Sequence, residues 1–150
     1  MAASDTKRDQ IIEAVKAELQ AMPDIAHVVR RLPSYSDLES FASTQFPAVA
    51  IVGRLPVPTE HITSRAGHVD HVVSELKVDL YCYFQDNKTP DSTISFLLNQ
   101  LWAALYSDQT KGGLVITTRL KPRERLEVWA RYGAFGLTVI TRYQHTPGGI

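Results

Sequence analysis

The sequence has little of what marks secreted, membrane or highly charged proteins. Cys82 is the one cysteine among 150 residues, so no internal disulfide can form, and we expect a buried side chain in a protein made in a reducing compartment. No apolar run approaches the roughly 18–20 residues of a membrane span, and the polar residues 1–9 lack a signal-peptide pattern. Sixteen Lys and Arg balance sixteen Asp and Glu. This neutrality gives no argument for nucleic acid, membrane or acidic substrates, and it does not oppose self-association.

Sequence motifs for catalysis are also missing. The chain contains no Gly-rich phosphate loop and no nucleophile elbow. His68 and His71 are the only clustered histidines, and positions three apart on a strand face opposite sides, so we favour solvated histidines over a metal site. A nucleophilic Cys82 would need an activating base that the sequence does not show. We therefore expect no catalytic residue, no cofactor and no metal, and a protein that is not an enzyme.

The clearest structural pattern lies between residues 69 and 120. Apolar and polar residues alternate over Val69–Phe84, which predicts a strand well beyond the usual length of roughly 5–6 residues. After a polar turn, Thr89 and Pro90 form a helix start, and the apolar residues from Ile94 to Leu105 recur every three or four positions. This spacing predicts an amphipathic helix, at about 89–107, that packs on a sheet.

A second group of elements completes an α+β domain. Gly112-Gly113 predicts a turn with a left-handed backbone. The remaining expected elements are a helix at Thr6–Met22, a short strand within Ile25–Leu32, a polar loop with one helical turn at Pro33–Gln45, and strands at Pro47–Val52, Leu114–Leu120 and Tyr132–Tyr143. This order predicts one domain over residues 1–150, with a mostly antiparallel β-sheet flanked by the N-terminal helix and the second amphipathic helix.

Two segments have no evident packing role within such a domain. Residues 54–70 include two prolines and little periodicity, which indicates a projecting arm or a segment that orders on a partner. Residues 121–131 carry Trp129 among many charges, and they form a hairpin tip or a second arm. Residues 144–150 are expected to be a flexible tail.

These two segments supply the residues that we expect at an interface. Glu124 and Glu127 interrupt the basic run that begins at Arg119, so we favour a solvated or interfacial role over nucleic-acid binding. The expected interface residues are Arg54, Arg65, His68, His71, Arg123, Arg125, Trp129 and Arg131.

The chain resembles the tail terminator proteins of long-tailed bacteriophages, also called tail completion or minor tail proteins. The resemblance covers about Asp9 to Tyr143. It rests on the N-terminal amphipathic helix, the Phe-Pro-Ala-Val-Ala strand at 46–50, the long arm, the Val-Asp-Leu-Tyr-Cys-Tyr strand at 78–83, and the helix that ends in Leu-Tyr-Ser-Asp at 105–108. The Gly-Gly-Leu-Val segment at 112–115 and two closing strands complete it.

The resemblance implies a curved sheet and a structural role in the virion. Such proteins form a hexameric ring that caps the tail tube, terminates tail polymerisation and joins the tail to the head-proximal neck. The implied partners are other copies of the chain, the tail tube protein, neck or head–tail connector proteins and a sheath protein. DNA would pass through the lumen without specific binding, and no membrane is involved. Assembly would take place in the host cytoplasm.

Two other kinds of protein remain open from the sequence. One is another neck, head-closure or tail tube component, and a tube subunit would polymerise alone into long tubes. The other is a small-molecule-binding α+β regulatory domain, which needs a pocket with convergent polar groups. The His68–His71 region is the only candidate for such a pocket.

Overall fold

The structure, a computed structural model, describes residues 6–65, 67–85, 90–123 and 132–147. In these ranges the strands are β1 (His27–Val29), β2 (Ala48–Gly53), β3 (Val57–Arg65), β4 (His68–Phe84), β5 (Thr117–Pro122) and β6 (Gly133–His145). They form one sheet in the order β1-β2-β4-β6-β5, and β3 pairs with β4 beside this path. Only the β1–β2 pair is parallel. The predicted α+β fold with a mostly antiparallel sheet is therefore confirmed.

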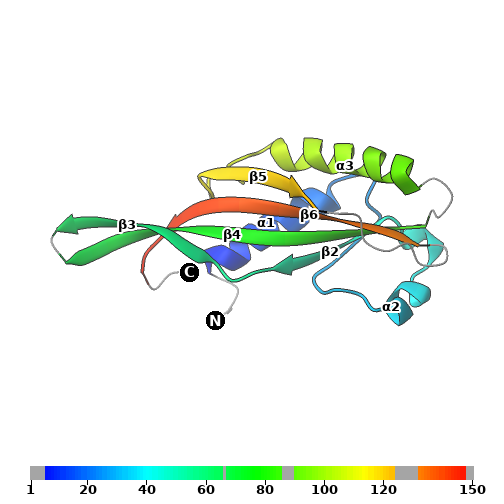
Figure 1. Ribbon diagram of the computed structural model, residues 1–150, viewed down its shortest axis with the longest axis horizontal. Helices are drawn as coiled ribbons and strands as arrows, with labels where there is room; N and C mark the ends of the chain where they lie inside the picture. The colour runs from blue at the N-terminus through cyan, green and yellow to red at the C-terminus, as the bar shows by residue number, and fades with distance from the viewer. Residues whose placement is uncertain (1–5, 66, 86–89, 124–131, 148–150) are drawn as a thin grey trace.

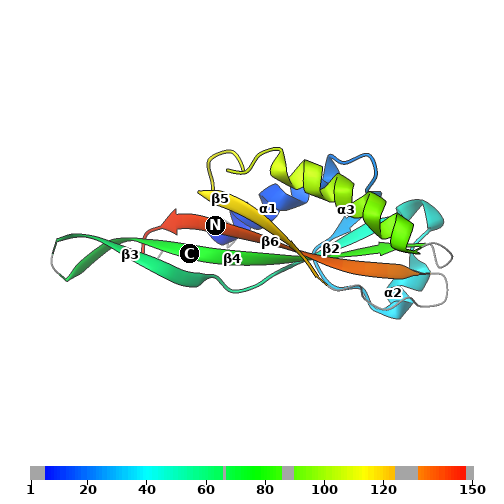
Figure 2. The same ribbon diagram turned by 45° about the horizontal axis from the view of Figure 1, so that its top comes forward.

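Three α-helices accompany the sheet: α1 (Lys7–Gln20), α2 (Tyr35–Ser40) and α3 (Pro90–Tyr106). Helices α1 and α3 cover one face, whereas the short α2 lies at the opposite end from β3 (Figures 1 and 2). A single 3-10 turn, Ser43–Gln45, precedes β2. Buried side chains therefore form two clusters: one lies between the sheet and the helices α1 and α3, and the other lies on the opposite face beside α2.

The main core forms where α1 and α3 meet the sheet. Ile11, Val15 and Leu19 of α1 are fully buried, and Leu101 and Leu105 of α3 are at most 1% exposed. They pack on the even-numbered apolar residues of β4, as the alternation predicted: Leu76, Val78, Leu80, Cys82 and Phe84. Each fully buried side chain of this size contributes about 1.5–3 kcal/mol through removal from water.

The helix ends follow from local sequence. The Thr6 side chain accepts a hydrogen bond from the Asp9 amide and caps α1, which satisfies one of the amides that a helix start leaves unpaired. Pro90 begins α3 as predicted, while Thr89 lies outside the described residues. After α3, Gly112 and Gly113 adopt φ values of 70° and 90°, which confirms the left-handed turn.

A buried ion pair joins this turn to α1. Lys111 Nζ is completely buried and donates to Glu18 Oε2 at 2.8 Å and to the Leu105 carbonyl at 2.9 Å. Burial raises the pKa of Glu18 even though Lys111 opposes that change. The amine thus satisfies a carbonyl at the end of α3 and ties both helices to the turn.

On the second face of the sheet, the described helices cover only one end. Leu38 of α2 packs with Ala50, Tyr83, Tyr132 and Ala134. The expected helical turn is in fact a helix with a capping box, in which Ser34 and Asp37 exchange hydrogen bonds. Because α2 is short, the described residues leave the middle of this face open.

The structure differs from the sequence predictions in three places. Residues 57–65, expected to lack regular structure, form strand β3. Strand β6 continues through His145, so the first two residues of the expected flexible tail are paired in the sheet. The alternation in β4 predicts that its odd-numbered residues are exposed or face a partner, but Tyr83 and Asp79 are 4% and 5% exposed. Tyr83 is covered by α2, and Asp79 is covered by cationic side chains.

Candidate functional site

The β3–β4 hairpin, residues 57–75, is the largest feature that leaves the body of the molecule, and we call it the arm. In Figure 1 it extends from the sheet at the end away from α2. Strands β2 and β3 pair with successive parts of the same side of β4: β2 pairs with residues 78–83 and β3 with residues 68–75. The uninterrupted 17-residue β4 therefore belongs to both the body and the arm.

In the described part of the chain, the outer part of the arm has no third strand beside it. On its other side, β4 pairs with β6 only as far as Val72, which lies opposite His145. In the distal arm, residues 62–71, the described residues thus make strand pairs only within the hairpin. An isolated two-stranded hairpin is marginally stable in water, and its open edges can pair with another chain. The distal arm has the properties of a docking element.

Exposed apolar side chains gather at the base of the arm and along β3. Within the described ranges, six large apolar side chains are conspicuously exposed, and three of them are Leu55 at 82%, Val57 at 61% and Ile62 at 38%. The other three, Leu32, Phe96 and Ile116, are dispersed in the sequence. Single exposed apolar residues are ordinary, whereas a group on one element indicates contact with a partner.

A charged cluster occupies the open middle of the sheet. Arg54 donates through Nε and Nη2 to the two carboxylate oxygens of Asp79, at 2.7 and 3.0 Å. Thr138 donates to the same carboxylate at 2.8 Å. Arg123 lies 3.6 Å from it and places its guanidinium over the Tyr81 ring, 4.7 Å from the centroid. One buried carboxylate therefore orders two arginines from distant parts of the sequence.

The environment of Asp79 favours the ionised carboxylate. Burial alone would raise the pKa of Asp79, but the hydrogen bonds from Arg54 and Thr138 and the two arginine charges outweigh burial and hold the pKa below its usual value. Stability from this group is therefore complete above the ordinary pKa of an aspartate, and it is lost as the pH falls through the lower pKa of the folded state.

Replacing this carboxylate tests the cluster. We expect Asp79→Asn to lower the free energy of unfolding at neutral pH by about 1–3 kcal/mol, because charge-assisted hydrogen bonds to Arg54 are lost. The difference in free energy of unfolding between the variant and the parent should become smaller as the pH falls below the ordinary aspartate pKa, because Asp79 of the parent then becomes protonated as well. Urea unfolding across this pH range measures both effects. A deficit that is independent of pH would contradict the assignment.

A buried serine and histidine pair lies at the base of the arm. Ser74 Oγ is 2.7 Å from His145 Nε2, and His145 Nδ1 is 2.6 Å from the Thr146 carbonyl. The carbonyl can only accept, so Nδ1 donates to it, and Nε2 shares a hydrogen bond with the Ser74 hydroxyl. Ser74 is 1% exposed and lies in a strand paired on both sides, with Tyr143 and Pro58 opposite. The pair therefore satisfies two buried polar groups and does not present a nucleophile.

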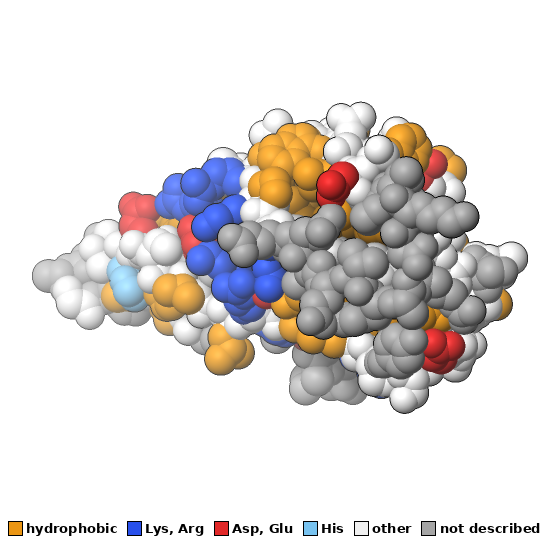
Figure 3. All heavy atoms as spheres, turned by 45° about the vertical axis from the view of Figure 1, so that its right-hand side comes forward, with side chains coloured by type: hydrophobic (Ala, Val, Ile, Leu, Met, Phe, Trp, Pro, Cys, Tyr) orange, Lys and Arg blue, Asp and Glu red, His pale blue; other side chains and the backbone are white. Residues whose placement is uncertain are grey.

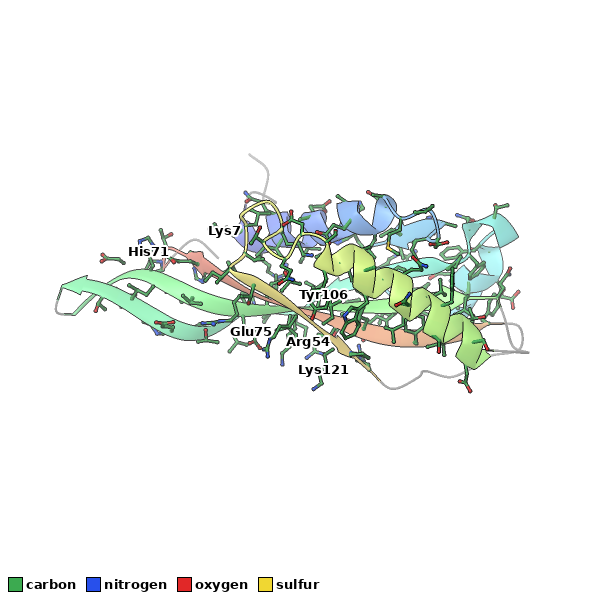
Figure 4. The ribbon with its side chains drawn as sticks, turned by 90° about the horizontal axis from the view of Figure 1, so that it is seen from above. Lys7, Arg54, His71, Glu75, Tyr106 and Lys121 are labelled. Atoms are coloured by element: carbon green, nitrogen blue, oxygen red, sulfur yellow. The ribbon has the colours of Figure 1, made fainter. Side chains whose placement is uncertain are left out.

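The remaining candidates for chemistry are inert or dispersed. Burial raises the pKa of the Cys82 thiol, which disfavours the reactive thiolate. Across the described part of the chain, no group of three or more His, Cys, Asp and Glu side chains converges as metal ligands would. A groove of about 510 Å³ is lined by Lys7, His71, Gln144 and His145 among others, and Lys7 Nζ already donates to the Gln144 carbonyl at 2.7 Å. Figure 4 shows Lys7 on α1 and His71 on β4.

The structure separates the predicted interface residues into two places. Arg54 and Arg123 meet at Asp79 on the sheet face. Arg65 and His68 are paired at the end of the arm, and His71 lies on the arm opposite Ile62. Arg125, Trp129 and Arg131 lie outside the described residues, so the expected second interface segment stays a prediction. Neither Asp79 nor the Ser74–His145 pair was predicted, because each depends on strand register between distant segments.

Comparisons with known proteins add no relative. No protein-family model matches the sequence, and no curated protein matches it. The described helices include none that is both long and apolar enough to cross a membrane. The function is therefore inferred from the arm, the sheet face and the resemblance.

Proposed function

We propose that the protein is a structural subunit that assembles through its arm into a closed ring, and that this ring is a phage tail terminator. The ring would cap the tail tube, stop its polymerisation and join the tail to the head-proximal neck. In this role the protein is not an enzyme, and its partners are other copies of itself, the tail tube protein and neck proteins. The localisation is the head-proximal end of the viral tail.

The observation that carries the proposal is the distal arm, which extends beyond every other strand that could support it. A hairpin that pairs only with itself gains most of its stability when a partner covers it. Leu55, Val57 and Ile62 provide apolar contact area on or beside the arm. Such a hairpin suits an interface with a small apolar centre and a polar rim.

The position of the arm is compatible with a ring. The arm is at one end of the molecule, away from α2 (Figures 1 and 2). If the arm of one copy contacts the body of the next without a return contact, the interface is heterologous, whereas a reciprocal exchange of arms gives a two-fold dimer. Repeated heterologous contacts close into a ring when the rotation allows it, and otherwise they continue as an open filament.

The more specific part of the proposal, that the ring is a tail terminator, comes from the resemblance. The Phe-Pro-Ala-Val-Ala strand, the arm and the Gly-Gly turn follow one another along the chain, and the resemblance to tail terminator proteins rests on this order. The order alone does not distinguish a terminator from another neck component or from a tube subunit. The three differ in what they do to a growing tube.

A tube-capping experiment tests the function directly. The purified protein is mixed with preformed tail tubes of the virus that encodes it, then with fresh tube subunits. We expect a ring at one end of each tube in electron micrographs and no further growth there. The arm-deleted variant described in the Discussion is the matched control and should leave growth unaffected. Continued growth with the parent protein, or long tubes formed by the protein alone, would contradict the terminator assignment.

A further inference from the structure

The open middle of the sheet, on the side opposite α1 and α3, is basic. Six cationic side chains occupy it, and we call them the basic face: Arg54, Lys77, Arg119, Lys121, Arg123 and Arg142. Strand register places them together, since residues directly opposite each other share a side of the sheet. Ile140 lies opposite both Lys77 and Arg119, and Thr138 lies opposite both Asp79 and Lys121. Figure 3 shows Lys and Arg side chains in a band across the molecule, and Figure 4 shows Arg54, Glu75 and Lys121 on the side away from α1.

Few carboxylates offset these cations. Asp79 is held by Arg54 and lies near Arg123, whereas Glu75 and Glu60 lie 3.8 Å from Arg119 and Arg142. Among the described residues, six cations against three carboxylates leave three positive charges on this surface, although the whole chain has a formal net charge of zero. Lys77 and Lys121 make no ion pair with any residue that the structure describes. The surface thus keeps cationic groups available for a ligand.

We propose that the basic face binds the phosphate backbone of double-stranded nucleic acid without reading its sequence. This inference goes beyond ring assembly, because it requires no neighbouring copy. Phosphate contacts of this kind are made by Arg and Lys, and they position a duplex without discriminating between bases.

The dimensions of the basic face fit several phosphates at once. Cations on one side of a strand recur every two residues, about 6.8 Å apart, and neighbouring strands are about 4.8 Å apart. The cations come from β5, β6, β4 and the residue after β2, so they cover about 14 Å across the sheet. A duplex carries one charge per about 1.7 Å of axis, or about eight charges over that length.

The composition of the basic face favours nucleic acid over an acidic protein. Protein interfaces have an apolar centre and are depleted in lysine. Here the six cations surround Thr138, Gly136 and the partly exposed Ile140 and Tyr81, and the exposed Val57 lies on the same side of the sheet, opposite Glu75. Cations outnumber the exposed apolar side chains on this surface, and such a surface matches a polyanion whose contacts are electrostatic.

Fluorescence anisotropy with a labelled duplex of about 20 base pairs and arbitrary sequence, at about 50 mM salt, tests the proposal. We expect Lys77→Ala/Lys121→Ala to weaken binding at least tenfold. It should also reduce the slope of log affinity against log salt by about 1.8, since each lost phosphate contact contributes about 0.9. Lys16→Ala/Arg31→Ala removes the same charge from other surfaces and should change the affinity less than twofold. Lys77→Arg/Lys121→Arg keeps the charge and should keep binding.

Three results would overturn the proposal. Absence of duplex binding by the parent protein at low salt overturns the proposal, as does an equal loss in the two alanine variants. Polyglutamate of matched charge that displaces the duplex as well as unlabelled duplex would assign the surface to an acidic polypeptide instead, which also overturns it. Thermal melts of all variants establish that they fold. Ring assembly is measured separately, so failure here leaves the arm proposal standing, and failure of assembly leaves this one standing.

Discussion

Removal of the distal arm is expected to convert the assembled protein into a folded monomer. Residues 62–71 are replaced by Asn-Gly, so that a two-residue turn joins His61 to its strand partner Val72. The body should remain folded, because β4 still pairs with β6 from Val72 onward and the core on α1 and α3 is untouched. Native mass measurement and a thermal melt of the same sample separate loss of assembly from loss of folding.

Point variants localise the contact more finely. Leu55→Ser/Val57→Thr removes the two most exposed apolar side chains at the start of the arm and keeps a good strand former at 57. We expect the dissociation constant of the assembly to rise at least about tenfold, as for truncation of anchoring apolar residues in an interface. Phe96→Gln is the control, because Phe96 is 53% exposed but lies on α3. If Phe96→Gln weakened the assembly and Leu55→Ser/Val57→Thr did not, the interface would lie on α3.

The second large effect concerns stability, through the buried Lys111–Glu18 pair. Glu18→Gln leaves the fully buried Lys111 amine without its counter-charge. Breaking a buried pair from one side costs about 3–5 kcal/mol, because the remaining charge stays desolvated. We therefore expect a loss of this size in urea unfolding at neutral pH, together with weaker attachment of the turn after α3.

The double variant Glu18→Leu/Lys111→Met, in contrast to Glu18→Gln, should not lower the free energy of unfolding. Burial opposes the ionisation of Glu18 and raises its pKa although Lys111 acts in the other direction, so desolvation of the carboxylate offsets part of its attraction to Lys111. An apolar pair of similar size removes this cost, and we expect stability close to that of the parent or above it. A double variant as unstable as Glu18→Gln would show that the pair is net stabilising.

The sequence predicted the elements whose signal is local. The alternation before Phe84 and the stripe from Ile94 to Leu105 each have one regular period, and both gave the correct element and the correct buried side. The strand at 48–53 was recognised because both its parities are apolar, and it lies between two other strands. In these cases the burial pattern of a single segment is sufficient.

Strand β3 was missed for a physical reason. Pro58 and three register irregularities interrupt any alternation in it, so its pairing partner and not its own pattern makes it a strand. The arm was expected near this position because two prolines and weak periodicity made a packed element improbable there. Its form as a hairpin on an extended β4 required knowledge of strand pairing.

The basic face was missed because its residues are dispersed in the sequence. Lys77 and Arg142 are separated by a helix and a strand, and only the register of β4 with β6 places them on one surface. Read alone, the run from Arg119 to Arg131 is interrupted by acidic residues, which argued against a polyanion. The cations contributed by β2, β4 and β6 change that balance.

The most direct test of arm-mediated ring assembly is the native mass of the purified full chain at micromolar concentration, with electron micrographs of the same sample. The account predicts a single closed ring of six copies, and a monomer when residues 62–71 are replaced. A strictly monomeric parent protein that stays monomeric in the presence of tail tubes would contradict it. So would a ring that persists unchanged without the distal arm.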